Sequence, residues 1–346
     1  MIGLLGFAAI WALAVWKRPP RWQLWAVAGG WWLAILWVHA PWGGLPPLAR
    51  LTGGDFRAWL VFGVILAVVG VYRLVLAAVK ARAAPTPVVA TPPKASFSAA
   101  ELDRYARHIM LREIGGPGQK RLKGAKVLVV GAGGLGSPVL LYLAAAGVGT
   151  VGVIDDDVVS NSNLQRQVIH TDARIGMPKV FSAELQMKAL NPYIEVRPYN
   201  RRLSGADAPT LFAEYDLILD GTDNFTTRYM VNAAAVAAGK PLIAGAIAQW
   251  EGQLSVYDPA RGAPCFACVF PEAPAAGLAP SCAEAGVVGA LPGVVGAMMA
   301  TEAIKEITGA GQGLRGRLLI HDALWGESRQ IAVKPRPGCA VCGAKG

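Results

Sequence analysis

The segment from Lys126 to Asp157 constrains the fold of this chain more than any other stretch. An apolar run at 127–130 leads into a glycine-rich break, and an alanine- and leucine-rich stretch then precedes a second apolar run, Val151 to Ile154. Two buried strands that flank a helix in this order are typical of a βαβ unit, so we expect an α/β fold. The break contains four glycines: Gly131, Gly133, Gly134 and Gly136.

The same segment predicts a nucleotide-binding site. Glycines permit a tight turn and a close approach of the backbone, so free N–H groups at the start of the following helix can meet phosphate oxygens. Asp155, which ends the second run about twenty residues further on, is placed to accept hydrogen bonds from ribose hydroxyls. Taken alone, this stretch favours an NAD-binding domain, and residues further along the chain are needed to decide.

The formal net charge of +10 is concentrated in the N-terminal part of the chain. Residues 1–97 hold nine Lys and Arg against one acidic residue, Asp55, whereas residues 98–346 hold 24 basic and 22 acidic residues. A role in binding nucleic acid would need a basic face on the folded domain. The nearly neutral C-terminal part therefore argues against nucleic acid as a partner.

Three apolar stretches predict a transmembrane region of about three helices over residues 1–82. They span 1–16, 22–38 and 58–79, and Arg73 interrupts the third. Crossing a bilayer takes roughly 20 apolar residues, so the first two are short and the third is long enough if Arg73 extends toward a surface. Seven tryptophans between positions 22 and 59 are placed like the aromatic belts of membrane interfaces.

The positions of the basic residues predict the orientation of this region. The positive-inside rule places the N-terminus outside and the chain after the third stretch in the cytoplasm. A Pro/Ala-rich linker is expected at 83–97 and a catalytic domain at 98–346. The basic residues beside the first and third stretches are Lys17, Arg18, Arg21, Lys80 and Arg82.

The first element expected in the C-terminal domain is a helix from Ala99 to about Arg112. Ser98 and Glu101 form a capping-box pattern at its start. Arg104 and Arg107 share one face of this helix because they are three residues apart. The glycine-rich sequence at 115–118 is expected to end the helix before the nucleotide-binding strand.

A second group of polar residues is expected near the glycine-rich break. The sequence Gly-Met-Pro-Lys at 176–179 leads into a predicted helix that continues through Leu190, and Leu217 to Leu219 is predicted to be a short strand. The sequence Asp-Gly-Thr-Asp-Asn follows that strand at 220–224. Ligands of open α/β sheets bind at the carboxyl ends of the strands, so Asp223 and its neighbours belong to the same predicted site.

Four cysteines predict a structural zinc site. Cys265 and Cys268 form one C-x-x-C pair, and Cys339 and Cys342 form another. Two such pairs supply four thiolates and complete a tetrahedral coordination sphere. Disulfides are disfavoured in a reducing cytoplasm, and redox chemistry of the two dithiols remains a weaker alternative.

The fifth cysteine, Cys282, occupies a different context. It follows a loop rich in Pro, Ala and Gly at 271–280, and Ser281 and Glu284 form a second capping-box pattern around it. If Ser281 caps a helix, Cys282 stands at the first helical position, where the helix dipole raises the thiolate fraction. The sequence leaves a reactive role and no role equally open.

Together these motifs resemble the E1-like adenylyltransferases of the MoeB, ThiF and HesA group over about 98–342. The resemblance implies a Rossmann-like E1-type adenylation domain with a mixed, mostly parallel sheet. It also implies a homodimer that uses ATP and Mg²⁺, with zinc in a structural role. The motifs that carry the resemblance are 104–108 (RYARH), 131–136 (GAGGLG), 163–167 (NLQRQ), Pro178-Lys179, 222–224 (TDN), 251–253 (EGQ) and both C-x-x-C pairs.

The resemblance also implies a substrate and a role for each site residue. The partner would be a ubiquitin-fold sulfur-carrier protein ending in Gly-Gly, which is adenylated for molybdopterin or thiamine-type biosynthesis. The resemblance implies that Arg166 and Lys179 bind phosphates, that Asp223 binds Mg²⁺ and that Asp155 binds the ribose. It further implies that Asn163 orients the α-phosphate and that Arg107 is supplied by the partner subunit. Asp157, Asn224 and the four glycines complete the implied nucleotide site, and Cys282 is a candidate catalytic residue.

Three other classes of function remain possible at this stage. An NAD-dependent oxidoreductase shares the glycine turn and Asp155, but it needs no set of Arg166, Lys179 and Asp223 around phosphates. A catalytically silent, membrane-tethered scaffold could bind a ubiquitin-fold protein without chemistry. A relative within the family could adenylate a small molecule or a tRNA nucleotide, which the nearly neutral domain disfavours.

Overall fold

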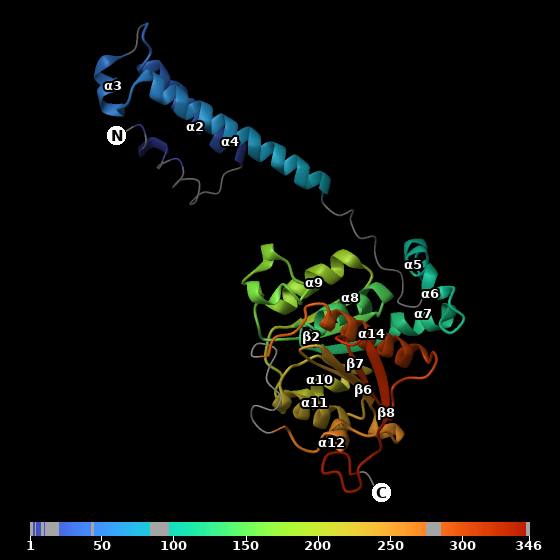
Figure 1. Ribbon diagram of the computed structural model, residues 1–346. Helices are drawn as coiled ribbons and strands as arrows, with labels where there is room; N and C mark the ends of the chain where they lie inside the picture. Colours follow the sequence, from blue (N-terminus) through green and yellow to red (C-terminus); the bar gives the residue numbers. More distant parts are fainter. Residues whose placement is uncertain are drawn as a thin grey trace. The chain divides into compact units, whose positions relative to one another are not determined.

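The computed structural model describes residues 3, 5–7, 10, 21–42, 45–83, 97–274 and 285–343. The chain divides into two compact units, residues 1–90 and 91–346. Figure 1 colours the first unit in blue and cyan and the second from green to red.

The N-terminal unit is helical and consists of α2 (Arg21–Val38), α3 (Pro46–Thr52) and α4 (Phe56–Ala83). Helices α2 and α4 contact each other, and the side chain of Trp32 connects them. The Trp32 Nε1 donates a hydrogen bond to the Trp59 carbonyl at 2.8 Å. The Trp32 ring lies against Gly63, where an added Cβ would come within 2.0 Å of it. A larger residue at position 63 would therefore have to displace the Trp32 ring.

The apolar surface of α4 is largely exposed. Its stretch Phe56–Leu76 is long and apolar enough to cross a membrane, and 6% of the most apolar window is buried. In α2 the apolar stretch Val27–Val38 is shorter, and the first predicted span lies largely outside the described residues. The described part of the chain thus contains one helix of membrane-spanning length, whereas the sequence predicted about three spans.

The C-terminal unit is built on an eight-stranded sheet in the order β3-β2-β1-β4-β5-β6-β7-β8. The pairs from β3 to β5 are parallel and those from β5 to β8 are antiparallel, so the prediction of a mixed sheet is confirmed. The strands are β1 (Lys126–Val130), β2 (Thr150–Ile154), β3 (Glu195–Tyr199), β4 (Leu217–Asp220), β5 (Leu242–Ala248), β6 (Glu251–Tyr257), β7 (Arg317–Asp322) and β8 (Glu327–Ala332).

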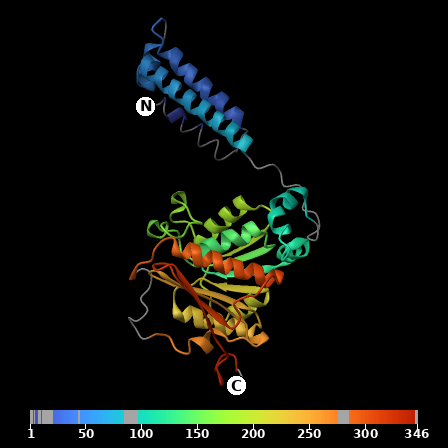
Figure 2. The same cartoon turned by 45° about the vertical axis from the view of Figure 1, so that its right-hand side comes forward.

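Helices cover both faces of this sheet, and alternate residues of β1 show why (Figures 1 and 2). Val127 and Val129 pack on one face with α7, α8, α9 and α14, whereas Leu128 and Val130 pack on the other with α10, α11 and α12. The helices are α7 (Gly115–Gly124), α8 (Gly136–Ala146), α9 (Lys179–Leu190), α10 (Ala208–Ala213), α11 (Phe225–Ala237), α12 (Phe266–Val269) and α14 (Leu291–Thr308), with short 3-10 turns at η1 (Asn161–Asn163), η2 (Asp172–Arg174) and η3 (Pro259–Arg261).

The start of this unit differs from the sequence prediction in two places. The capping box of Ser98 and Glu101 is present, but the expected long helix breaks at Tyr105 into α5 (Ala99–Arg104) and α6 (Ala106–Ile109). The Tyr105 side chain is buried and accepts a hydrogen bond from Asn191 at 2.8 Å. The sequence at 115–118 opens α7 instead of ending a helix, because proline is tolerated in a first helical turn.

Candidate functional site

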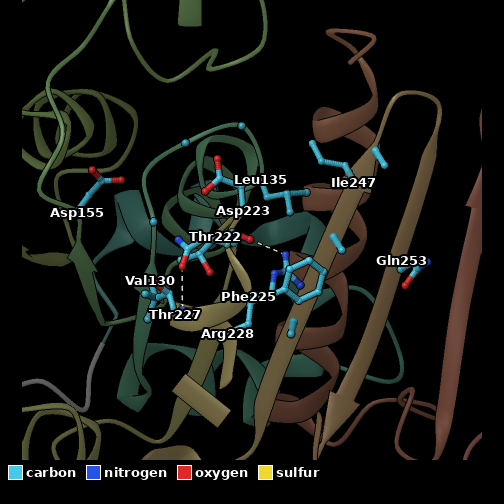
Figure 3. A pocket seen from close by; sticks show the side chains of 18 of the residues that line it. Val130, Leu135, Asp155, Thr222, Asp223, Phe225, Thr227, Arg228, Ile247 and Gln253 are labelled. Atoms are coloured by element: carbon cyan, nitrogen blue, oxygen red, sulfur yellow. Dashed lines mark hydrogen bonds between the residues drawn. The ribbon is translucent and has the colours of Figure 1, made fainter. Parts of the chain in front are cut away.

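A cavity of about 750 Å³ lies at the carboxyl ends of β1, β2, β4 and β5. This volume is within the range of small-molecule sites. Figure 3 shows side chains from β1, β5, β6 and the β4–α11 loop around it. Of the predicted nucleotide-site residues, those that line it are Gly131, Gly133, Gly134, Asp155, Asp157, Arg166, Lys179, Asp223 and Asn224.

The glycine turn between β1 and α8 is tightly packed. Gly131 has a φ of +96°, which side chains rarely allow. At Gly136 a Cβ would come within 2.0 Å of the Gly131 carbonyl oxygen, so the turn requires glycine there. Gly136 does not line the cavity itself, but it allows α8 to begin directly beside the turn.

The Asp155 carboxylate holds this turn and the segment that follows β2. Its Oδ2 accepts a hydrogen bond from the Ala132 N–H at 2.7 Å, and its Oδ1 accepts one from the Asp157 N–H at 2.8 Å. Each carboxylate oxygen has a further lone pair, so Asp155 can still accept hydrogen bonds from ribose hydroxyls.

Lys179 is the first residue of α9, and its side chain is 5% exposed. Its Nζ lies 2.8 Å from the Asp157 Oδ2, and its backbone N–H donates to the Asp157 carbonyl at 2.9 Å. Arg166 reaches the same cavity and donates from Nη1 to the Ser162 carbonyl at 3.2 Å. Two cationic side chains therefore stand beside the glycine turn, where phosphates would need them.

The loop between β4 and α11 carries the predicted metal residue. The Asp223 side chain is exposed and lines the cavity. Asn224 accepts a hydrogen bond from the Thr227 N–H at 2.8 Å and so caps α11. The buried Asp220 fixes the loop by accepting hydrogen bonds from the Thr222 N–H and hydroxyl at 2.9 and 2.7 Å.

His170 is a buried residue that the sequence reasoning missed. Its Nε2 lies 2.9 Å from the Ala132 carbonyl of the glycine turn, and its Nδ1 lies 2.9 Å from the Ser182 Oγ on α9. Burial lowers the pKa of His170, so the neutral form is favoured. Because a carbonyl can only accept, Nε2 carries the proton, and His170 connects the turn to the helix of Lys179.

Arg228, Arg201 and Arg202 also line the cavity and were not predicted. Arg201 and Arg202 follow β3, whose carboxyl end lies beside that of β2, and no motif marked them. Arg228 lies in the first turns of α11 and is 7% exposed. The one sequence signal for Arg228 was its position six residues after Thr222, in the helix that directly follows the predicted metal-binding loop.

Two further predicted residues, Asn163 and Arg107, are not among those that line the cavity. Asn163 is half-buried in η1, where its carbonyl accepts from the backbone N–H groups of Arg166 and Gln167. Arg107 is exposed on α6 and is not among the cavity residues. Cys282 lies outside the described residues.

Cys265, Cys268, Cys339 and Cys342 form one cluster whose sulfur atoms all lie within 4.8 Å of one another. The Cys265 Sγ is 3.7 Å from those of Cys268 and Cys339, and the Cys268 Sγ is 3.5 Å from that of Cys342. A disulfide needs about 2.05 Å. Tetrahedral zinc with Zn–S bonds of about 2.3 Å places its sulfurs about 3.8 Å apart, so the cluster fits zinc.

Comparisons with known proteins agree with this arrangement. The ThiF family model matches residues 105–341. The "Sulfur carrier protein adenylyltransferase" of Thermus thermophilus is 51% identical over 247 residues, which is 70% of this chain and 91% of the relative. The "SAMP-activating enzyme E1" of Haloferax volcanii is 47% identical over 251 residues, which is 72% of this chain and 92% of the relative.

Solved structures show the same fold at lower identity. A crystal structure of E. coli MccB with MccA-N7isoASN covers 70% of this chain and 75% of its own, with a TM-score of 0.63 and 24% identity. The extent of the family match identifies the family of this chain, and the cavity with its glycine turn and the four-cysteine cluster agree with it. The chain belongs to the ThiF family, whose model spans nearly all of its C-terminal unit.

Proposed function

We propose that this chain is an ATP-dependent adenylyltransferase that activates the C-terminal glycine of a ubiquitin-fold sulfur-carrier protein. The observation that carries this function is one cavity that holds the glycine turn, Asp155, Lys179, Arg166 and Asp223. The similarity to relatives named for sulfur-carrier adenylylation and SAMP activation identifies the class of substrate.

In the proposed reaction a terminal carboxylate oxygen of the carrier attacks the α-phosphorus of ATP. The bond between the α-phosphorus and the bridging oxygen breaks, and acyl-adenylate and pyrophosphate form. Negative charge on the phosphoryl oxygens is stabilised by fixed positive groups in such a step. Lys179 and Arg166 supply this charge, the N–H groups of the glycine turn bind phosphate oxygens, and Asp155 holds the ribose.

Asp223 is the proposed Mg²⁺ ligand. It is the exposed carboxylate of the β4–α11 loop, and no hydrogen bond or ion pair in the described part of the chain occupies it. Carboxylate oxygens suit Mg²⁺, which usually keeps several waters and takes further ligands from substrate phosphates. The metal would neutralise charge on the phosphates, and the capped start of α11 holds Asp223 in place.

The four-cysteine cluster is proposed to hold structural zinc. Its thiolates would satisfy all four coordination positions, which leaves none open for substrate. The cluster joins the α12 region to the segment that follows β8. The ion would therefore stabilise the fold and take no part in adenylation.

Homodimerisation is proposed from the position of Arg107. This arginine is exposed on α6 and outside the cavity of its own chain, as expected for a residue that completes the site of a partner subunit. Cys282 remains a candidate for a covalent adduct with the activated carrier. The pathway is proposed to be molybdopterin or thiamine-type cofactor biosynthesis.

Membrane attachment through the N-terminal unit, with the catalytic unit in the cytoplasm, is also proposed. From Val64 to Leu76, every side chain of α4 except Gly70 is exposed, and Arg73 is the single charged residue there. Exposed apolar side chains on all sides of a helix are unfavourable in water and favourable in lipid. Separation of the protein with the membrane fraction, and its resistance to extraction by carbonate, would test this attachment.

The function is tested by ATP–pyrophosphate exchange in the presence and absence of a ubiquitin-fold carrier ending in Gly-Gly. Exchange that requires the carrier and ATP supports the proposal. Binding of NAD in preference to ATP would support the oxidoreductase alternative, and carrier binding without exchange would support the scaffold alternative.

A further inference from the structure

The guanidinium of Arg228 is a buried positive charge on the wall of the cavity. Its Nη2 donates to the Thr222 carbonyl and to the Gly245 carbonyl, each at 2.5 Å. These bonds join the β4–α11 loop to β5, and Figure 3 shows the one to Thr222. In the described part of the chain, no carboxylate lies within ion-pair distance of Arg228.

The remaining donors of Arg228 are available to a ligand. A guanidinium has five N–H groups, of which Nη2 uses two here. The Nε and Nη1 atoms have no hydrogen-bond partner among the described residues, and neither is among the fully buried atoms that lack one. Because Arg228 is 7% exposed and lines the cavity, we infer that these donors are accessible from the cavity. A buried, unpaired cation of this kind favours an anion.

The order of the strands indicates which anion lies there. Asp155 follows β2, whereas the Arg228 guanidinium is bonded to Gly245 of β5, and the order β2-β1-β4-β5 separates them by three strand spacings. At about 4.8 Å each, this is about 14 Å. A nucleotide with its ribose at Asp155 and its phosphates at the glycine turn of β1 extends toward Asp223 after β4. Lys179 and Arg166 would hold the β- and γ-phosphates, and the carboxylate attacks the α-phosphorus from the side opposite the leaving pyrophosphate. The acyl substrate would therefore lie on the β5 side of the α-phosphate.

The wall beside Arg228 suits the end of a glycine-terminated chain. Ala244, Ala246 and Ala248 lie on one face of β5 and line the cavity. Ala244 packs with α11, the helix that carries Arg228. Side chains this small leave room for a backbone without side chains of its own.

We propose that Arg228 binds the C-terminal carboxylate of the acyl substrate. This inference rests on the proposed function and names the group that recognises its substrate. As one carboxylate oxygen bonds to the α-phosphorus and pyrophosphate leaves, the other oxygen becomes the acyl carbonyl and stays at Arg228. The guanidinium keeps its protons throughout. Because the substrate loses its negative charge in this step, Arg228 contributes mainly to binding of the carrier, and its loss raises KM more than it lowers kcat.

The test compares two forms of one probe on the full-length protein. The probe is a ubiquitin-fold sulfur carrier ending in Gly-Gly, prepared with either a free C-terminal carboxylate or a C-terminal amide. Binding is measured with a non-hydrolysable ATP analogue present. Wild type should bind the carboxylate form about ten- to a hundredfold more tightly, the range for a charged hydrogen bond. Arg228→Gln should bind both forms equally, with the affinity that wild type has for the amide.

Two variants serve as controls. Arg112→Gln makes the same chemical change at an arginine whose side chain is 94% exposed, and it should retain the preference for the carboxylate. Arg228→Lys keeps the charge and should retain part of that preference. ATP affinity should match wild type in both Arg228→Lys and Arg228→Gln, and both variants should remain folded.

Each other outcome contradicts the inference in a distinct way. A preference for the carboxylate that survives in Arg228→Gln overturns the inference and leaves the proposed function intact. Weakened ATP binding in Arg228→Gln would show that Arg228 binds a phosphate. Unfolding of both Arg228→Gln and Arg228→Lys would show that its role is structural. If wild type binds neither form of the carrier, both the proposed function and the inference are wrong.

Discussion

Replacing Lys179 with alanine should separate catalysis from folding stability. The Lys179 side chain is buried at the cavity, but Asp157, its ion-pair partner, has a side chain that is 68% exposed. Solvent screens such a pair, so its loss should lower the free energy of unfolding by about 1 kcal/mol or less. In a domain of this size, that corresponds to a fall in Tm of about 2–4 °C.

The effect on activity should be much larger. A fixed charge at a reacting phosphate contributes about 2.7–4 kcal/mol to the transition state, so carrier-dependent ATP–pyrophosphate exchange should fall about a hundred- to a thousandfold. The matched control is Lys188→Ala in the same helix, where an exposed lysine pairs with Glu184. This variant should lose about 0.5 kcal/mol of stability and no exchange activity. Exchange in Lys179→Ala within tenfold of wild type would refute the assignment of Lys179 to the phosphates.

Four further predictions concern separate parts of the molecule. Metal analysis should find about one zinc per chain in wild type and none in Cys339→Ser, together with a lower Tm; full zinc in the variant would contradict the four-cysteine site. Mixing the inactive Arg107→Ala and Asp223→Ala variants should restore part of the activity, because one site of the heterodimer would contain both residues. No recovery of activity in proven heterodimers would indicate that Arg107 acts within its own chain. Gly136→Ala places a methyl carbon 2.0 Å from a backbone carbonyl and should abolish ATP binding, and unchanged nucleotide affinity would show that the turn adapts. Adenylation should survive Cys282→Ala while any reducible carrier adduct disappears, and an adduct that persists would point to another residue.

The parts of the site that could be predicted from the sequence depend on local geometry. The glycines of the β1–α8 turn and Asp155 are close along the chain, and Gly131 and Gly136 each have a backbone reason to be glycine. Each C-x-x-C pair has the spacing typical of zinc ligands. The two pairs could therefore be expected to lie together in the fold, although Cys265 and Cys339 are 74 residues apart in the chain. Helix α9 and strand β4 were also located correctly, because they are bounded by Pro178 and by the sequence at 220–224.

The parts that were missed depend on contacts between distant segments. Arg228 matters because α11 packs beside β5, and nothing near it in the chain shows that Gly245 lies opposite. The break at Tyr105 follows from the burial of its ring, which contacts Gly147, and from its hydrogen bond to Asn191. His170 likewise acquires its role only when α9 and the glycine turn meet. Periodicity along the sequence carries no information about such partners.

The spacing of the four cysteines has a consequence for how the protein folds. Cys265 and Cys339 touch across 74 residues of chain, and the segment between them contains α14, β7 and β8. An ion that bound both pairs would make this segment a closed loop, even in a chain that had not yet folded. By the chain-entropy argument used for disulfides, closing a loop of this length lowers the conformational entropy of the unfolded state by the equivalent of about 4.5 kcal/mol. Zinc would therefore favour early assembly of the antiparallel half of the sheet, where pairing would otherwise wait for a slow encounter of distant strands.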